Sequence, residues 1–228
     1  MAYPDFVMFL TGRSNSVGNQ TTAGYTTAGE NVLMWNGVDD FIQCVDPTLG
    51  GTGASCWPAF GNAFYTATGL SIGFVQKSVN GIGNVAYWSN GIGDTYYDAF
   101  LSDVSTVGQI DGLIMWCEDH DYPSVTYSDM YNAACDFADN VANDVSATLK
   151  IGVVNPYWVA AAAGDNTAAW EAAAGVKSNL ELLVRADNYE RVPADSVHLS
   201  KAGQDAIGAK LASKFVAKRI KHNAETIF

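Results

Sequence analysis

The sequence predicts an α/β fold, a three-layer α/β/α arrangement with a parallel central sheet. Short apolar runs at residues 6–10, 70–75, 110–116 and 149–154 alternate with longer segments that carry apolar residues at helical spacing. Strands that alternate with helices are typical of a parallel sheet covered on both faces. In such a fold we expect functional groups beyond the carboxyl ends of the strands.

The elements between these strands follow in order along the chain. Residues 17–56 are rich in Gly, Thr and Asn and indicate a long decorated loop, with a short apolar patch at Val32–Trp35 that could form a small hairpin. Helices are expected at residues 58–68, 96–104, 127–147 and 166–184, and a last helix from Ser200.

Length and composition favour a single folded domain over residues 1–228. The chain is 48% hydrophobic and 16% charged, which argues against disorder. No apolar run reaches the roughly 18 residues of a membrane span. The apolar run at 6–10 has no basic region before it and reaches Ser14, so we do not interpret it as a signal peptide. A cytoplasmic location and delivery within a larger or phage-type assembly both stay open.

The net charge of −12 makes a nucleic-acid backbone an unfavourable partner. The last helix carries several basic residues. Positive charges interact favourably with the C-terminal end of a helix dipole, so we interpret these residues as stabilising the helix rather than binding a partner. They are Lys210, Lys214, Lys218, Arg219 and Lys221.

Four cysteines are too few for a disulfide scaffold at this length. Cys44 and Cys56 flank a Gly/Pro/Thr-rich loop and could close it in an oxidising compartment. No pair has the spacing of zinc ligands, so we expect no structural metal.

Two short segments at opposite ends of the chain carry candidate chemistry. Gly12-Arg13-Ser14-Asn15 follows the first apolar run, and Asp195-Ser196-Val197-His198 precedes the last helix. A serine hydroxyl becomes a useful nucleophile when a base takes its proton and an acceptor orients that base. Ser14, His198 and Asp195 could supply these roles. Taken singly, Ser14 could also be a turn residue and Asp195 a helix cap.

These segments resemble the SGNH (GDSL-type) hydrolase superfamily, and the GRSN form is similar to the GQSN of its sialate O-acetylesterase and acetylxylan-esterase-like branch. Val79–Trp88 resembles that branch's "GGT…W" segment, and Gly112–Asp121 resembles its "QGE" segment. The continuation Leu199-Ser200-x-x-Gly203 extends the C-terminal match. The resemblance spans residues 6–216 and implies a single domain with an SGNH, flavodoxin-like fold.

The resemblance implies a serine esterase that removes short acyl groups, most simply acetyl, from a carbohydrate without a cofactor. Ser14 would form the acyl-enzyme, with His198 as general base and Asp195 as its partner. Backbone N–H groups of Ser14 and Gly81 would form the oxyanion hole. Cys117 occupies the position of the third donor, although a thiol donates weakly, and His120 is a substitute.

Three further residues are candidate substrate contacts: Arg13, Asn15 and Trp88. Arg13 replaces the family's glutamine and could bind a carboxylate or a sugar hydroxyl, or be solvent-exposed. Trp57 and Trp88 flank loops near the expected cleft and could stack on a sugar, although large aromatic residues are mostly core.

Other functions fit the sequence less well. Glu118, Asp119 and Asp121 are too close in sequence to face each other across a glycosidic bond, which disfavours a glycosidase. A lipase or thioesterase remains an alternative within the same class. A non-catalytic glycan-binding or virion and cell-surface decoration module is the alternative from another class, but it would not need all three triad residue types.

Overall fold

The computed structural model describes residues 3–18, 25–81, 95–117, 126–155, 164–186, 189–193 and 195–225, without the side chains of 164–166, 195–197 and 220–225. The strands are β1 (Phe6–Gly12), β2 (Val32–Trp35), β3 (Phe41–Gln43), β4 (Ile72–Gln76), β5 (Gly112–Trp116), β6 (Ile151–Asn155), β7 (Leu180–Arg185), β8 (Arg191–Val192) and β9 (Asp195–Leu199). The helices are α1 (Ser14–Val17), α2 (Trp57–Thr68), α4 (Thr95–Val107), α5 (Tyr127–Asp144), α6 (Gly164–Val176) and α7 (Lys201–Glu225).

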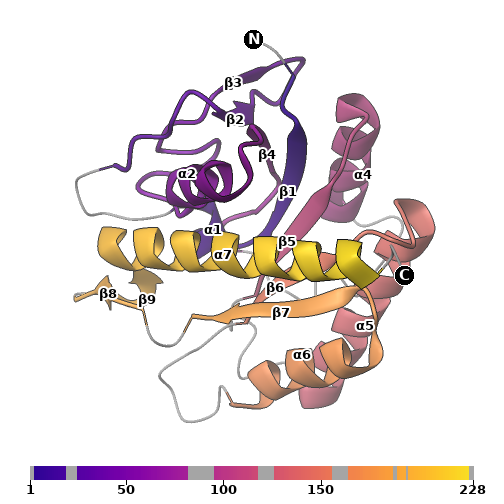
Figure 1. Ribbon diagram of the computed structural model, residues 1–228. Coiled ribbons are helices and arrows are strands. Elements are labelled where there is room, and N and C mark those ends of the chain that lie inside the picture. The colour runs from indigo at the N-terminus through magenta and orange to yellow at the C-terminus, as the bar shows by residue number, and fades with distance from the viewer. Residues whose placement is uncertain are drawn as a thin grey trace.

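A seven-stranded sheet in the order β3-β2-β4-β1-β5-β6-β7 forms the centre of the fold (Figure 1). Every pair is parallel except β2 with β3 at one edge. The chain adds β2 and β4 on one side of β1, and then β5, β6 and β7 on the other. β1 and β5 are therefore the point at which the strand order reverses, where α/β proteins place their binding sites.

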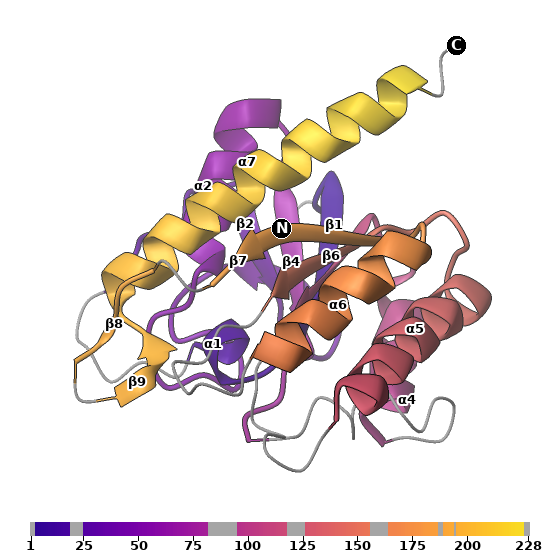
Figure 2. The ribbon, with the colours of Figure 1, turned by 90° about the horizontal axis from the view of Figure 1, so that it is seen from below.

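Helices cover both faces of the sheet, which confirms the predicted α/β fold with a parallel central sheet (Figure 2). On one face α4, α5 and α6 pack around Phe9, and the ring of Phe100 meets Phe9 edge-on at 5.6 Å. On the other face α2 and α7 pack around Phe74, which lies 5.7 Å from the ring of Phe60. All seven residues of β1 are buried, as expected for a strand covered on both sides.

The helix predicted at 166–184 is wrong in its second half. Helix α6 ends at Val176, and β7 pairs with β6 from Leu180 onward. Asn179 separates the two elements: its side chain donates to the Ala138 carbonyl at 2.7 Å, and its own carbonyl accepts the Ile151 N–H at 2.8 Å. Leu and Glu, which occur in this segment, also favour helices, so the local sequence did not reveal the strand. The segment forms a strand because it pairs with the edge of β6.

Residues 17–56 contribute more to the sheet than a decorated loop would. Their apolar patch forms β2, which pairs in parallel with β4, and β3 closes the hairpin at the sheet edge. A second small sheet, β8 with β9, contains Asp195 and His198. It lies beside the start of α7 (Figures 1 and 2).

Candidate active site

β1 ends at a glycine that no other residue could replace without strain. Gly12 has φ +132°, and a Cβ there would lie 2.4 Å from the Trp116 carbonyl oxygen of β5. This close approach lets β1 end against β5 and turn at once into the one-turn helix that begins at Ser14. The Gly12 carbonyl also accepts the Val79 N–H at 3.0 Å, so the chain after β4 returns to the same end of the sheet.

Helix α1 has only four residues and depends on the rest of the protein for its stability. The Ser16 carbonyl accepts hydrogen bonds from Trp57 Nε1 at 2.6 Å and from Gln76 Nε2 at 2.9 Å. The Ser16 hydroxyl pairs with that of Ser78 at 2.7 Å. Ser16, the serine nearest to Ser14 in sequence, therefore anchors the turn.

The next residue of α1 joins the turn to the C-terminal segment. Asn15 Oδ1 accepts the Leu199 N–H at 2.8 Å, a buried bond between residues 184 apart in sequence. Gln204 Nε2 of α7 donates to the Asn15 carbonyl at 3.0 Å. Because Ser14 precedes Asn15 and His198 precedes Leu199, these bonds bring the two predicted catalytic segments side by side.

Asn15 is buried and its side-chain oxygen is bound to Leu199, so this oxygen is committed to the protein rather than to a substrate. Ser14 itself is 1% exposed, and His198 is half-buried at the end of β9. Asp195 is the first residue of β9, and its side chain is outside the described part of the structure.

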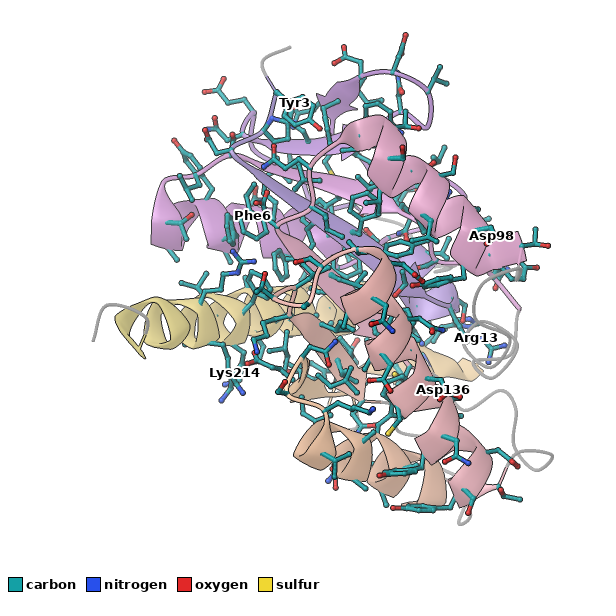
Figure 3. All side chains as sticks on the ribbon, turned by 90° about the vertical axis from the view of Figure 1, so that its right-hand side faces the viewer. Tyr3, Phe6, Arg13, Asp98, Asp136 and Lys214 are labelled. Carbon is teal, nitrogen blue, oxygen red and sulfur yellow. The ribbon has the colours of Figure 1, made fainter. Side chains whose placement is uncertain are left out.

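Arg13 is 2% exposed and is among the largest fully buried side chains. The alternative of a solvent-exposed arginine is therefore wrong. Figure 3 labels both ends of β1, with Phe6 at its start and Arg13 just after its end. Arg13 thus accompanies Ser14 at the carboxyl end of the sheet.

The remaining candidates lie at the same end or outside the described residues. Gly81 is exposed and has φ +75°, and no side chain or backbone atom that the structure describes outside its chain neighbours lies within 4 Å of where a Cβ would be. Cys117 is buried, and its backbone N–H donates to the Val154 carbonyl at 3.0 Å. Trp88, Glu118, Asp119, His120 and Asp121 lie outside the described residues.

Trp57 is part of the core and does not stack on a sugar. It is fully buried, and its ring lies 5.7 Å from Phe74 and 6.3 Å from Trp116. The interpretation of Trp57 as a sugar-stacking ring is wrong, because the ring is buried and its indole N–H donates to α1 from inside the protein.

The loop between β3 and α2 supports α1 from another side. Thr48 Oγ1 donates to the Val17 carbonyl at 2.6 Å, and Asp46 accepts a hydrogen bond from Ser55 Oγ at 2.7 Å. Burial raises the pKa of the Asp46 carboxyl from 3.8 to about 6, partly offset by the Ser55 bonds. Cys44 and Cys56 are buried free thiols at the ends of this loop.

A family model describes almost the whole chain. Residues 5–217 match the family described as carbohydrate esterase, sialic acid-specific acetylesterase. The chain belongs to this family. It is therefore a carbohydrate esterase, and the predicted resemblance to the acetylesterase branch is confirmed. A search of curated protein sequences finds no significant match.

Several solved structures have a similar fold. A protein from Arabidopsis thaliana has a TM-score of 0.75 and 18% identity, over 94% of this chain and 99% of that one. Est24, a carbohydrate acetylesterase from Sinorhizobium meliloti, has a TM-score of 0.61 and 13% identity, over 93% and 99%. XAC1771, a carbohydrate acetylesterase from Xanthomonas citri, has a TM-score of 0.67 and 13% identity, over 92% of this chain and 55% of that one.

Two further findings concern only the part of the chain that the structure describes. Its His, Cys, Asp and Glu side chains form no group that could hold a metal ion. None of its helices combines the length and the apolar character needed to cross a membrane.

The bond between Asn15 and Leu199 predicts a stability effect. Replacing Asn15 with Ala leaves the buried Leu199 N–H unsatisfied and should lower the free energy of unfolding by about 1–3 kcal/mol. Asn15→Asp keeps an acceptor oxygen but places a carboxylate at a buried position, so it should also lower the free energy of unfolding. Urea denaturation measures both, with Asn132→Ala on the exposed face of α5 as the control. An equal effect of Asn15→Ala and Asn132→Ala would contradict this role of Asn15.

The raised pKa of Asp46 predicts that the free energy of unfolding depends on pH. Its folded pKa lies above the unfolded value, so the carboxylate destabilises the fold progressively as the pH rises from about 4 to about 6. Asp46→Asn keeps an acceptor for Ser55 and should stabilise the protein at pH 8 by about 1–2 kcal/mol, allowing for solvent screening. Near pH 3.5 the gain should vanish.

Urea midpoints at the two pH values measure the effect, and Asp136→Asn, an exposed carboxylate on α5, is the control (Figure 3). A gain from Asp46→Asn that is the same at both pH values would exclude the titration of Asp46 as its cause.

Proposed function

We propose that this carbohydrate esterase removes acetyl groups through an acyl-enzyme on Ser14. The observation that carries the proposal is the buried hydrogen bond from the Leu199 N–H to Asn15 Oδ1. It joins the residue after Ser14 to the residue after His198, and a nucleophile and its base need such proximity. Family membership supports the hydrolysis of an ester, and this bond supports the assignment of the residues.

In the proposed reaction His198 takes the Ser14 proton as Oγ attacks the carbonyl carbon of the ester. The tetrahedral intermediate collapses as the bond between the carbonyl carbon and the sugar oxygen breaks and His198 returns the proton to that oxygen, which leaves as a sugar hydroxyl. A water molecule then attacks the acyl carbon as His198 takes its proton, and His198 passes that proton to Ser14 Oγ as the bond between the acyl group and Oγ breaks and acetic acid leaves as acetate. Asp195 would fix the tautomer of the imidazole and stabilise its charged form.

The negative oxygen of the intermediate needs hydrogen-bond donors, each worth about 3 kcal/mol. We assign this role to the backbone N–H groups of Ser14 and Gly81. The bond from Val79 to the Gly12 carbonyl supports the pairing, because it holds the segment before Gly81 against the end of β1. The Cys117 backbone N–H is engaged by Val154, and its thiol is a weak donor, so we propose two principal donors.

The substrate is proposed as an acetylated carbohydrate. The family description names a sialic acid-specific acetylesterase, and Est24 and XAC1771 are described as carbohydrate acetylesterases. This family membership disfavours the alternative of a non-catalytic glycan-binding module. Polar groups surround the turn at Ser14, among them Gln76 and Ser78, and suit a polar substrate better than a lipid tail.

If Ser14 and His198 act together, the effects of their substitutions on kcat should be strongly non-additive. Ser14→Ala and His198→Ala should each lower kcat for p-nitrophenyl acetate by about 10³-fold or more, because nucleophile and base act as one unit. The double variant should be hardly worse than either single variant. Asp195→Asn should cost less, because it leaves the base in place.

Two controls accompany these variants. Ser16→Ala removes the competing hydroxyl and should change kcat by less than about tenfold, since that hydroxyl bonds to Ser78. Cys117→Ala should leave kcat within a few-fold. Multiplicative losses for Ser14 and His198, or a loss at Cys117 as large as that at Ser14, would overturn the triad.

The acyl preference gives a separate prediction. Hydrolysis of p-nitrophenyl acetate should be faster than that of the decanoate ester, measured as kcat/KM, since the sequence shows no extended apolar lid or helix beside Ser14 that could receive a lipid tail. Faster turnover of the decanoate ester would place the chain with the lipases instead.

A further inference from the structure

An apolar cavity lies at the opposite end of the sheet from Ser14. Its volume is about 300 Å³, and its walls come from the start of β1, the end of α2, the turn before β4 and the C-terminal half of α7. Phe6, Phe64, Leu70 and Phe215 supply most of its apolar surface. Phe6 and Gly12 are the first and last residues of β1, so about 20 Å separate this cavity from the candidate active site.

One positive charge borders this apolar cavity. The guanidinium carbon of Arg219 lies 4.7 Å from the ring centre of Phe6 and 5.3 Å from that of Phe215. Contacts of this kind use the face of the guanidinium and leave its N–H edge available. Within the part of the chain that the structure describes, Arg219 forms no hydrogen bond and no ion pair.

The nearest acidic groups do not neutralise Arg219 by direct contact. Asp111 and Glu181 act on it electrostatically, but burial has the larger effect and lowers the pKa of Arg219. Asp111 Oδ2 already accepts the Val7 N–H at 2.8 Å and Gln109 Nε2 at 2.5 Å. Partial burial of a guanidinium without a bound carboxylate costs free energy, and a bound anion would offset part of that cost.

We propose that this cavity binds a small amphiphilic carboxylate, with its hydrocarbon chain among Phe6, Phe64 and Phe215 and its carboxylate on Arg219. The volume is at the lower end for small-molecule sites, about 300–1,000 Å³, and suits a chain of medium length. The apolar walls and the guanidinium of Arg219 match the two parts of such a ligand. This site does not depend on ester hydrolysis at Ser14.

Isothermal titration of the full chain with sodium octanoate tests the proposal, with octan-1-ol as the neutral ligand of equal chain length. Octanoate should bind one saturable site at least about tenfold more tightly than octan-1-ol. Arg219→Met keeps an apolar stem and should abolish this difference. Lys214→Met makes the same change in charge and should preserve it, because Lys214 projects from the side of α7 turned away from Phe6 (Figure 3).

A second variant addresses the apolar walls. Ala67 lines the cavity from the exposed face of α2, and Ala67→Trp should weaken both ligands without unfolding the protein, as checked by its thermal midpoint. Binding at this site should leave p-nitrophenyl acetate hydrolysis unchanged. The absence of saturable binding, equal losses from Arg219→Met and Lys214→Met, or competition between octanoate and the acetate ester would each overturn the proposal.

Discussion

The arrangement of the candidate site depends on one buried hydrogen bond, from the Leu199 N–H to Asn15 Oδ1. A single helical turn has no stability of its own, so the position of Ser14 is set by what surrounds α1. Trp57 and Gln76 fix it from α2 and β4, and Gln204 fixes it from α7. The turn that carries Ser14 thus depends on tertiary structure and is held by groups from both halves of the chain.

The two ends of β1 have different chemical characters. At the carboxyl end, Gly12 permits a backbone contact with Trp116 and is followed by polar residues that hydrogen-bond to other elements. At the amino end, Phe6 lies among aromatic rings under Arg219. Because the strand spans the sheet, the candidate active site and the apolar cavity share no residues.

Family membership shows the class of reaction, and the structure shows how the candidate site is held together. The family model establishes a carbohydrate esterase over residues 5–217, whereas structures at 18% identity or less establish the fold. The structure adds the bonds that connect the segments of Ser14 and His198. It also explains why Trp57, which the sequence leaves as a candidate for substrate contact, supports the turn instead.

The sequence by itself determined the α/β class and the strand at the first apolar run, because hydrophobic periodicity is a local signal. Its GRSN and DxxH segments predicted the proposed catalytic residues. It left β7 unrecognised, since Leu180–Arg185 suits a helix until β6 offers an edge. It also could not show that Arg13 and Asn15 are buried. Burial and hydrogen-bond partners depend on contacts between distant residues, and only the tertiary structure decided those.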